Sequence, residues 1–201
     1  MKTTNLILAS LFFVLATSSI HAQRAKLVEG DLSALKGEKE INIEFTYDSM
    51  RVGKYEKESD FVAYKKEQLN KSEAGKGDTW AVKWVDDRSY KFEPKFIETF
   101  QNYSQLQVGK KLAAKYTIIF HTTFTEPGFS AGWPVRKSAE IRGEALIVET
   151  ADRTKVLGKI TIEKAMGSPY GGFDFDTGVR ITDAYGEAGK GIGKLVKDKT
   201  I

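Results

Sequence analysis

Four segments of the chain alternate apolar and polar side chains, and this pattern restricts the possible folds more than any other feature. They cover residues 40–47, 116–124, 141–147 and 156–162. Because successive side chains of a strand point to opposite faces of its sheet, each segment is expected to form a strand with one apolar face. A sheet covered on both sides would instead show continuous apolar runs. We therefore expect a sheet with helices on one face only.

Between the first and second of these segments, the apolar period changes to that of helices. Ser59 and Asp78 are suited to cap the starts of two helices, and Pro94 is suited to the first turn of a third. A further helix is expected near the C-terminus, and residues 23–37 are expected to be a leading segment. The predicted fold is an α+β two-layer sandwich, with an about four-stranded, mainly antiparallel sheet and helices on one face, in the order β-α-α-α-β-β-β-α.

The stretch GEAGKGIGK, residues 186–194, has the composition of a phosphate-binding loop. It lacks the spacing of a Walker loop, and the residues before it follow the period of a helix rather than that of a strand. The apolar residues from Ile181 to Val196 are spaced three and four apart, which is one stripe of an amphipathic helix. Gly186 and Gly193 lie beside this stripe, where glycine lets a neighbouring backbone come close. We expect a packing helix and no bound nucleotide.

The first residues have the features of a secretory signal peptide. Lys2 precedes an apolar run at residues 6–16, and small residues follow as far as Ala22. We expect cleavage after Ala22, so that residues 1–22 are a signal peptide and residues 23–201 form a single α+β domain. The run is too short to span roughly 30 Å of hydrocarbon, so no membrane anchor is expected after cleavage. The predicted location is outside the cytoplasm, either periplasmic or secreted.

The cysteine count and the charge exclude several classes of function. The chain contains no cysteine, so disulfides and thiolate metal sites are excluded. Removal of the signal peptide, in which Lys2 is the only charged residue, lowers the net charge by one from +4. This is a mild excess in a chain of which 29% of the residues are charged, so nucleic acid is not an expected partner.

Two further features have some character of a metal or catalytic site. His121 is the only histidine that follows the signal peptide, and a single histidine without cysteine makes neither a typical zinc site nor a catalytic triad. The sequence FDFDTG, residues 173–178, resembles the opening of a calcium loop but lacks the third oxygen ligand before the glycine and the closing glutamate. We expect no metal, no cofactor and no catalytic residue.

Two functions are compatible with these observations. The first is a non-catalytic exported binding or assembly module of the bacterial cell envelope, which the absence of a recognisable nucleophile, metal cluster or cofactor loop favours. The alternative is a carboxylate-dependent hydrolase that acts on an envelope or extracellular polymer. Asp86, Asp87, Glu93 and Glu98 offer carboxylates for acid–base chemistry, but they occur among lysines and arginines in an expected helical region. A solvated helix face is the simpler interpretation of them.

The expected topology gathers two long segments at one end of the sheet. The last three strands are joined by short connections and should form an antiparallel meander. Residues 125–137 and 167–177, which follow the first and third strands of that meander, then emerge at the same end. Residues 50–55 arrive there too if the first strand of the chain is parallel to the second.

These segments carry aromatic side chains beside carboxylates and a guanidinium. Such a surface suits an envelope glycan or a partner protein, because it combines flat apolar contact with directional hydrogen bonds. The alternative is that the aromatic side chains only anchor long loops on the core. The residues predicted to bind a ligand are Phe129, Trp133, Arg136, Tyr170, Phe173, Asp174 and Asp176.

Four short stretches carry a resemblance to other proteins. They are GDLSALKG at residues 30–37, RSYKFEPKF at 88–96, TTFTEPGF at 122–129 and GFDFDTGVRI at 172–181. They resemble a group of small, uncharacterised, exported bacterial proteins, and the resemblance extends over nearly the whole chain after the signal peptide. It implies a shared fold and compartment, and no catalytic residue. The order of strands and helices is also similar, more loosely, to α/β domains of bacterial envelope-assembly proteins.

Overall fold

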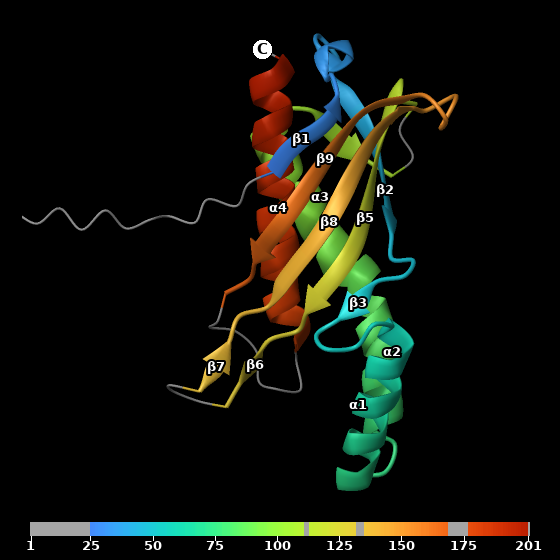
Figure 1. Ribbon diagram of the computed structural model, residues 1–201, viewed down its shortest axis with the longest axis vertical. Coiled ribbons are helices and arrows are strands. Elements are labelled where there is room, and N and C mark those ends of the chain that lie inside the picture. Colours follow the sequence, from blue (N-terminus) through green and yellow to red (C-terminus); the bar gives the residue numbers. More distant parts are fainter. Residues whose placement is uncertain (1–24, 111–112, 132–134, 169–176, 201) are drawn as a thin grey trace, which may run out of the picture.

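The computed structural model describes residues 25–110, 113–131, 135–168 and 177–200 (Figure 1). Its strands are β1 (Ala25–Gly30), β2 (Glu40–Thr46), β3 (Arg51–Val52), β4 (Gln107–Gly109), β5 (Tyr116–Glu126), β6 (Phe129–Ser130), β7 (Arg136–Lys137), β8 (Glu140–Glu149) and β9 (Val156–Met166). Its helices are α1 (Glu58–Ser72), α2 (Lys76–Asp87), α3 (Glu93–Ser104) and α4 (Thr177–Thr200), with a 3-10 turn at Ser33–Leu35 and a π-helical turn at Arg88–Phe92. The expected signal peptide, residues 1–22, lies outside the described residues.

The predicted fold class is wrong in the size and the type of the sheet. The described chain forms a seven-stranded mixed sheet in the order β1-β9-β8-β5-β2-β4, with β3 beside β5, and a separate two-stranded sheet of β6 and β7. β2 runs parallel to β4 and β5, and β3 runs parallel to β5. The prediction was an about four-stranded, mainly antiparallel sheet. β3 and β4 have two and three residues, too few to show a period, and β1 lies in the charged leading segment.

The four long strands coincide with the four alternating segments. β5, β8 and β9 pair as the expected antiparallel meander, which is confirmed. β2 is parallel to β5, which is the condition under which residues 50–55 reach the end of β5. Ile43 of β2 pairs with Ile118 of β5, which in turn pairs with Ile147 of β8, and all three are completely buried. Burial of such an apolar row contributes roughly 25 cal/mol per Å² of apolar surface, which is the main stabilisation of the sheet.

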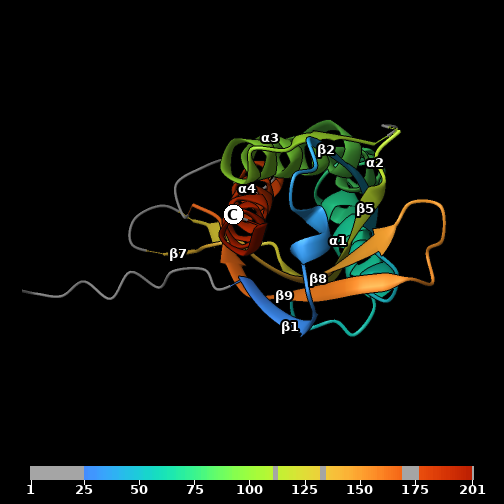
Figure 2. The same cartoon turned by 90° about the horizontal axis from the view of Figure 1, so that it is seen from above.

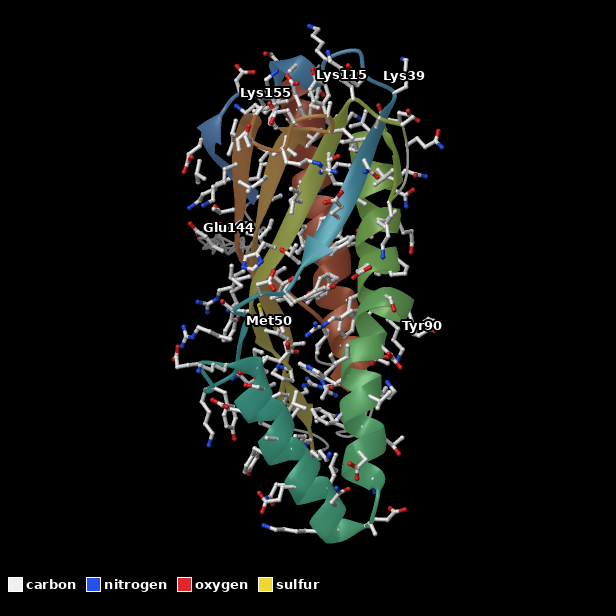
Figure 3. All side chains as sticks on the ribbon, turned by 90° about the vertical axis from the view of Figure 1, so that its right-hand side faces the viewer. Lys39, Met50, Tyr90, Lys115, Glu144 and Lys155 are labelled. Atoms are coloured by element: carbon white, nitrogen blue, oxygen red, sulfur yellow. The ribbon has the colours of Figure 1, made fainter. Side chains whose placement is uncertain are left out.

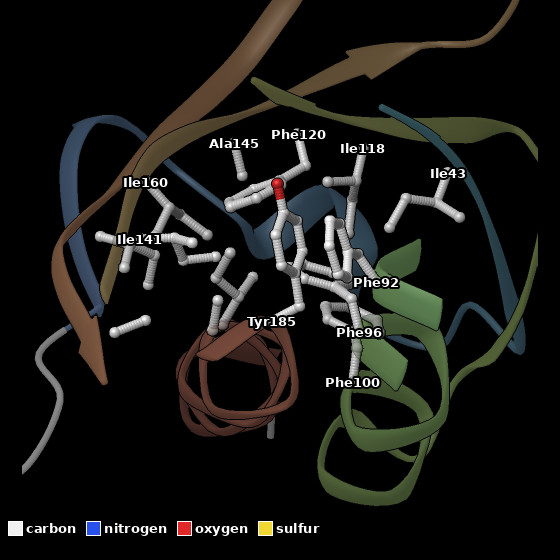
Figure 4. Close-up of a cluster of buried hydrophobic side chains, with 14 of the residues drawn as sticks. Ile43, Phe92, Phe96, Phe100, Ile118, Phe120, Ile141, Ala145, Ile160 and Tyr185 are labelled. Atoms are coloured by element: carbon white, nitrogen blue, oxygen red, sulfur yellow. The ribbon is translucent and has the colours of Figure 1, made fainter. Parts of the chain in front are cut away.

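α3 and α4 lie together against one face of the curved sheet (Figure 2). Their aromatic side chains meet the apolar face of the sheet in a single cluster (Figure 4). Tyr185 of α4 stacks on Phe92 at 5.2 Å between ring centroids, and Phe96 of α3 lies 4.7 Å from Phe120 of β5. Close packing of this cluster fixes the positions of both helices relative to the strands.

The glycine-rich stretch 186–194 lies within α4, which confirms the expected packing helix. A Cβ atom at Gly193 would lie 2.7 Å from the carbonyl oxygen of Phe100. A Cβ atom at Gly189 would lie 2.3 Å from the carbonyl oxygen of Phe96, closer still. The hydroxyl of Thr99 on α3 also donates to the carbonyl of Gly186 at 2.8 Å. The glycines therefore allow direct contact between the backbones of α3 and α4.

α2, the π-helical turn and α3 follow one another without a break, so residues 76–104 form one continuous helix. Trp84 and Phe92 are eight positions apart, which in an uninterrupted α-helix would turn their side chains about 80° from each other. The wider π-helical turn reduces this angle, and both side chains are buried. α1 and α2 extend past the end of the sheet (Figure 1), and we call this pair of helices the arm.

Candidate functional site

The predicted binding end is the end of the sheet at which β5 and β9 finish. β3 pairs with the end of β5, where the amide of Gly53 donates to the carbonyl of Thr125 at 2.9 Å. The amide of Gly167, just after β9, donates to the carbonyl of Ala139 at 2.9 Å. Residues 51–53 therefore lie beside the end of β5, as expected, and Gly167 lies beside Ala139, the residue before β8. A meeting of residues 50–55 with the segment that follows β9 stays a prediction. We call the β6–β7 hairpin, the end of β9 and the first turn of α4 the hairpin end.

Two of the predicted binding residues lie in this described region. Phe129 on β6 is 40% exposed, and Arg136 on β7 is partly buried. The two strands pair with each other, so both residues belong to one hairpin. The five other residues, all predicted from the same loops, lie outside the described residues and stay predictions: Trp133, Tyr170, Phe173, Asp174 and Asp176.

Three more apolar side chains are exposed at the hairpin end. Val135 just before β7 is 55% exposed, Met166 at the end of β9 is 45% exposed, and Val179 in the first turn of α4 is 38% exposed. Single aliphatic residues in different segments carry no periodic signal, so none of the three was predicted. Val179 lines a groove with Pro94 and Lys95 of α3, whereas Val135 lies next to the β6–β7 hairpin that carries Phe129. Exposed apolar side chains that lie near one another are a feature of interaction surfaces.

A buried arginine connects α4 to the hairpin end. Arg180 is completely buried, and its Nη2 donates to the carbonyl of Gly128 at 3.3 Å. Glu126 accepts from the amide of Gly128 at 3.2 Å and pairs with Lys137 at 2.7 Å. Gly128 has φ +66° and a Cβ atom there would lie 2.4 Å from the carbonyl oxygen of Lys137, so only glycine fits. These contacts hold the residue before Phe129 in one position.

A second group of polar side chains lies where the arm joins the sheet. Glu58, the first residue of α1, accepts from the indole Nε1 of Trp84 at 2.5 Å and pairs with Arg88 in the π-helical turn. The Arg88 guanidinium lies over the Tyr47 ring, 4.1 Å from its centroid, and the Tyr47 hydroxyl donates to Glu93 at 3.1 Å. We call these five residues the arm-base cluster. They link α1, α2, the π-helical turn and the segment after β2.

Two buried tyrosines extend this cluster into the core. Burial raises the pKa of Tyr47 far above its ordinary value, and the nearby Tyr185 and Glu93 act in the same direction. Burial likewise raises the pKa of Tyr185, whose hydroxyl lies 2.7 Å from the hydroxyl of Thr122. Both phenols are therefore neutral at physiological pH and are poorly suited to act as bases. Their geometry supports a structural role between the arm and the core.

Two of the carboxylates that the hydrolase alternative requires pair with lysines of the same helix. Asp87 pairs with Lys83 at 2.8 Å, and Glu98 pairs with Lys95 at 3.0 Å. Asp86 is exposed whereas Asp87 is buried, so these neighbours point to different sides of α2. They do not form the carboxylate pair that acid–base hydrolysis uses.

His121 also has a partner within the sheet. Its Nδ1 lies 2.9 Å from the hydroxyl of Thr46 on β2, and the side chain is partly buried. Among the described residues, no three His, Cys, Asp or Glu side chains are grouped so that they would hold a metal ion. In the same part of the chain, no helix combines the length and apolar character needed to cross a membrane.

Comparison with known proteins gives no family assignment. No protein-family model matches the chain, and no curated protein matches its sequence significantly. Among solved structures, the chain is similar to the PelC dodecamer from Paraburkholderia phytofirmans, with 9% identity and a TM-score of 0.35, over 81% of this chain and 94% of that one. It is also similar to a DUF330 protein from Xanthomonas campestris, with 11% identity and a TM-score of 0.39, over 84% of this chain and 90% of that one. TM-scores this low do not establish a common fold, and the resemblance to small exported bacterial proteins stays a prediction.

Proposed function

We propose that the protein is an exported, non-catalytic binding or assembly module of the bacterial cell envelope and that its partner docks on the hairpin end. The observation that carries this proposal is the exposure of Phe129, Val135 and Met166, which belong to the β6–β7 hairpin and the end of β9. Covering apolar surface is favourable by roughly 25 cal/mol per Å², so a partner that shields these side chains from water gains stability.

The base of the hairpin end is held in place before any partner arrives. Arg180 and Glu126 both bond to the backbone of Gly128, one residue before Phe129. A surface that is already ordered loses less conformational entropy on binding. This supports a binding role for the exposed side chains rather than a loop that only closes the core.

The chemistry of the exposed side chains favours a protein over a glycan as the partner. Val135 and Met166 are aliphatic and suit the apolar centre of a protein interface. Stacking against a sugar ring requires aromatic faces, and Phe129 is the one aromatic residue among these three. The aromatic residues predicted at positions 133, 170 and 173 would strengthen the glycan alternative.

Site-specific photo-crosslinking in cells tests the proposal. A photoreactive amino acid at position 129 should form a crosslink to a protein partner that mass spectrometry identifies. The same amino acid in place of Val156, which is 51% exposed at the other end of β9, is the matched control and should give no such product. Equal products at both positions, or no product at position 129, would contradict docking on the hairpin end.

Binding of the purified partner provides the second measurement. Phe129→Ser should weaken binding about tenfold or more without lowering the melting temperature, because the side chain is exposed in the free protein. Val156→Ser should leave binding unchanged. Release of reducing ends from envelope polymers that is lost in Glu93→Gln would instead favour the hydrolase alternative.

A further inference from the structure

Asparagine and glutamine are concentrated in one short stretch of the chain. The sequence contains nine of these residues, and four of them occur within QNYSQLQ, residues 101–107. Charged residues make up 29% of the chain, yet this stretch contains none. A solvated helix end followed by an edge strand would ordinarily carry lysine and glutamate, as α1 of the same chain does.

The structure places all four carboxamides around one groove. The groove is shallow and open, lies between the last turn of α3 and β4, and has a volume of about 580 Å³. Leu106 and Val108 are 8% and 9% exposed and form its apolar floor. Six residues of the described chain line it, and all of them are uncharged: Gln101, Asn102, Gln105, Leu106, Gln107 and Val108.

Two contacts fix the shape of this groove. The backbone amide of Val108 donates to the side-chain oxygen of Gln101 at 3.2 Å. This bond orients the Gln101 carboxamide, and the Gln101 amino group is directed away from Val108. Gln105 ends α3 with φ +66°, and its amide donates to the carbonyl of Gln101 at 3.0 Å. β4 is an edge strand, but its Val108 amide is already bonded, so this edge is poorly suited to pair with an extended peptide.

We propose that this groove binds a neutral, hydroxyl-rich ligand, such as a segment of an uncharged glycan chain. A carboxamide both donates and accepts hydrogen bonds, as a hydroxyl group does, and the described residues of the lining carry no charge that would select an ion. The floor of Leu106 and Val108 offers apolar contact to the C–H face of a sugar ring. β4 pairs with the start of β2, so the groove lies at the opposite end of the sheet from the hairpin end. The site is therefore independent of the docking surface proposed above.

Nuclear magnetic resonance titration of the ¹⁵N-labelled protein tests this site. The probes are cellotetraose, maltotetraose and chitotetraose, each added up to about 20 mM because weak sites of this kind have dissociation constants near 1 mM. At least one neutral probe should shift the side-chain amide signals of Asn102 and Gln105 and the backbone signals of residues 101–108. Absence of shifts with all three probes, or shifts confined to another part of the protein, would overturn the proposal.

A double variant separates recognition from folding. Asn102→Ala with Gln105→Gly removes two carboxamides, and glycine fits the positive φ at position 105 without strain. Loss of two hydrogen-bonding groups should weaken binding about tenfold. Gln68→Ala, which removes an exposed carboxamide from α1, is the matched control and should bind as the parent protein does.

Charged and peptide probes complete the test. Tetragalacturonate and an extended, end-capped peptide should bind more weakly than the best neutral probe. Stronger binding of either one, or unchanged affinity in the double variant, would show that the groove does not select neutral hydroxyl-rich ligands. Phe129→Ser should leave the titration unchanged, which keeps the result separate from docking on the hairpin end.

Discussion

The two halves of the continuous helix at residues 76–104 are stabilised in very different ways. α3 packs beside α4 against the sheet, and its Phe96 and Phe100 are completely buried. α2 packs mainly on α1, and its outer side leaves Val82 63% exposed and Val85 51% exposed. At the π-helical turn between them, Tyr90 points away from the protein (Figure 3) and is 78% exposed.

This difference shows that burial in this protein depends on the neighbouring element more than on the helix itself. The arm has no sheet beneath it, and no residue of α1 is fully buried. Its cohesion comes from aromatic contacts, such as Phe61 with Trp84 at 5.1 Å between ring centroids, and from the arm-base cluster. A segment with few buried contacts opens more readily than the core, so we expect the arm to be the less stable half.

The largest expected effect is the loss of a core aromatic side chain from α3. Phe96→Ala should lower the free energy of unfolding by about 4 kcal/mol, because it leaves a cavity in the centre of the core. Leu69→Ala in α1 should lower it by about 1 kcal/mol, because that side chain is only partly buried. Denaturant unfolding measures both values. Equal losses would contradict the difference between the two halves.

Matched glycine substitutions sharpen the comparison. A Cβ atom at Gly189 would lie 2.3 Å from the carbonyl oxygen of Phe96, and one at Gly77 in the arm would lie 2.0 Å from that of Lys66. Gly189→Ala should cost about 2 kcal/mol, since α3 and α4 cannot separate without disrupting the core. Gly77→Ala should cost about 1 kcal/mol, since the arm can open locally. The melting temperature of each variant is the measurement, and a larger loss in Gly77→Ala would reverse the order of the two halves.

The buried tyrosines predict a loss of stability in alkali. Burial is the main cause that raises the pKa of Tyr47 and Tyr185 above the ordinary value of 10.0, so the folded protein keeps protons that the unfolded chain releases. The stability that this difference in pKa gives the folded protein is fully present below pH 10. Above that pH the free energy of unfolding falls by up to about 1.4 kcal/mol per pH unit for each tyrosine. Denaturant unfolding from about pH 8 to 11 measures the slope. Tyr185→Phe should reduce it, and an unchanged slope would contradict this assignment.

The smallest expected effect concerns the attachment of the arm. Glu58→Gln removes the charge that pairs with Arg88. The side chain of Glu58 is 22% exposed and that of Arg88 is 18% exposed. Local opening of α1 and α2 should become easier by about 1 kcal/mol, while α3 should be nearly unaffected. Hydrogen exchange resolves the two regions. Glu67→Gln removes an exposed partner of Lys71 and is the control, and faster exchange throughout both halves would show that Glu58 stabilises the whole fold.

Sequence periodicity predicted the elements that bury a long apolar face. The four long strands and α4 follow from side chains that repeat over several residues, and the close packing at Gly193 followed from its place beside the apolar stripe of α4. The short strands β3 and β4 could not be predicted in this way. They form because backbone groups of residues 51–52 and 107–109 reach the edges of strands that are already paired.

The candidate site shows the same division. Phe129 was predicted as a binding residue because aromatic residues are recognisable in a glycine-rich loop. Val135, Met166 and Val179 were missed, since only the fold brings them to the same end. The carboxamides of residues 101–107 were not predicted as a site, because only the turn at Gln105 brings β4 beside the end of α3.

The amino-acid sequence by itself determined which segments become long strands and helices and which of their faces is apolar. That information is local, because a side chain's face depends on the repeat of its own element. The tertiary structure alone decided the number of strands, the mixed pairing of the sheet, the projection of the arm and the gathering of exposed side chains at the hairpin end. These features depend on contacts between residues far apart in the chain, such as those of Arg180 with Gly128 and Glu93 with Tyr47. These features are stabilised by packing and hydrogen bonds among several segments together, so no single stretch of sequence indicates them.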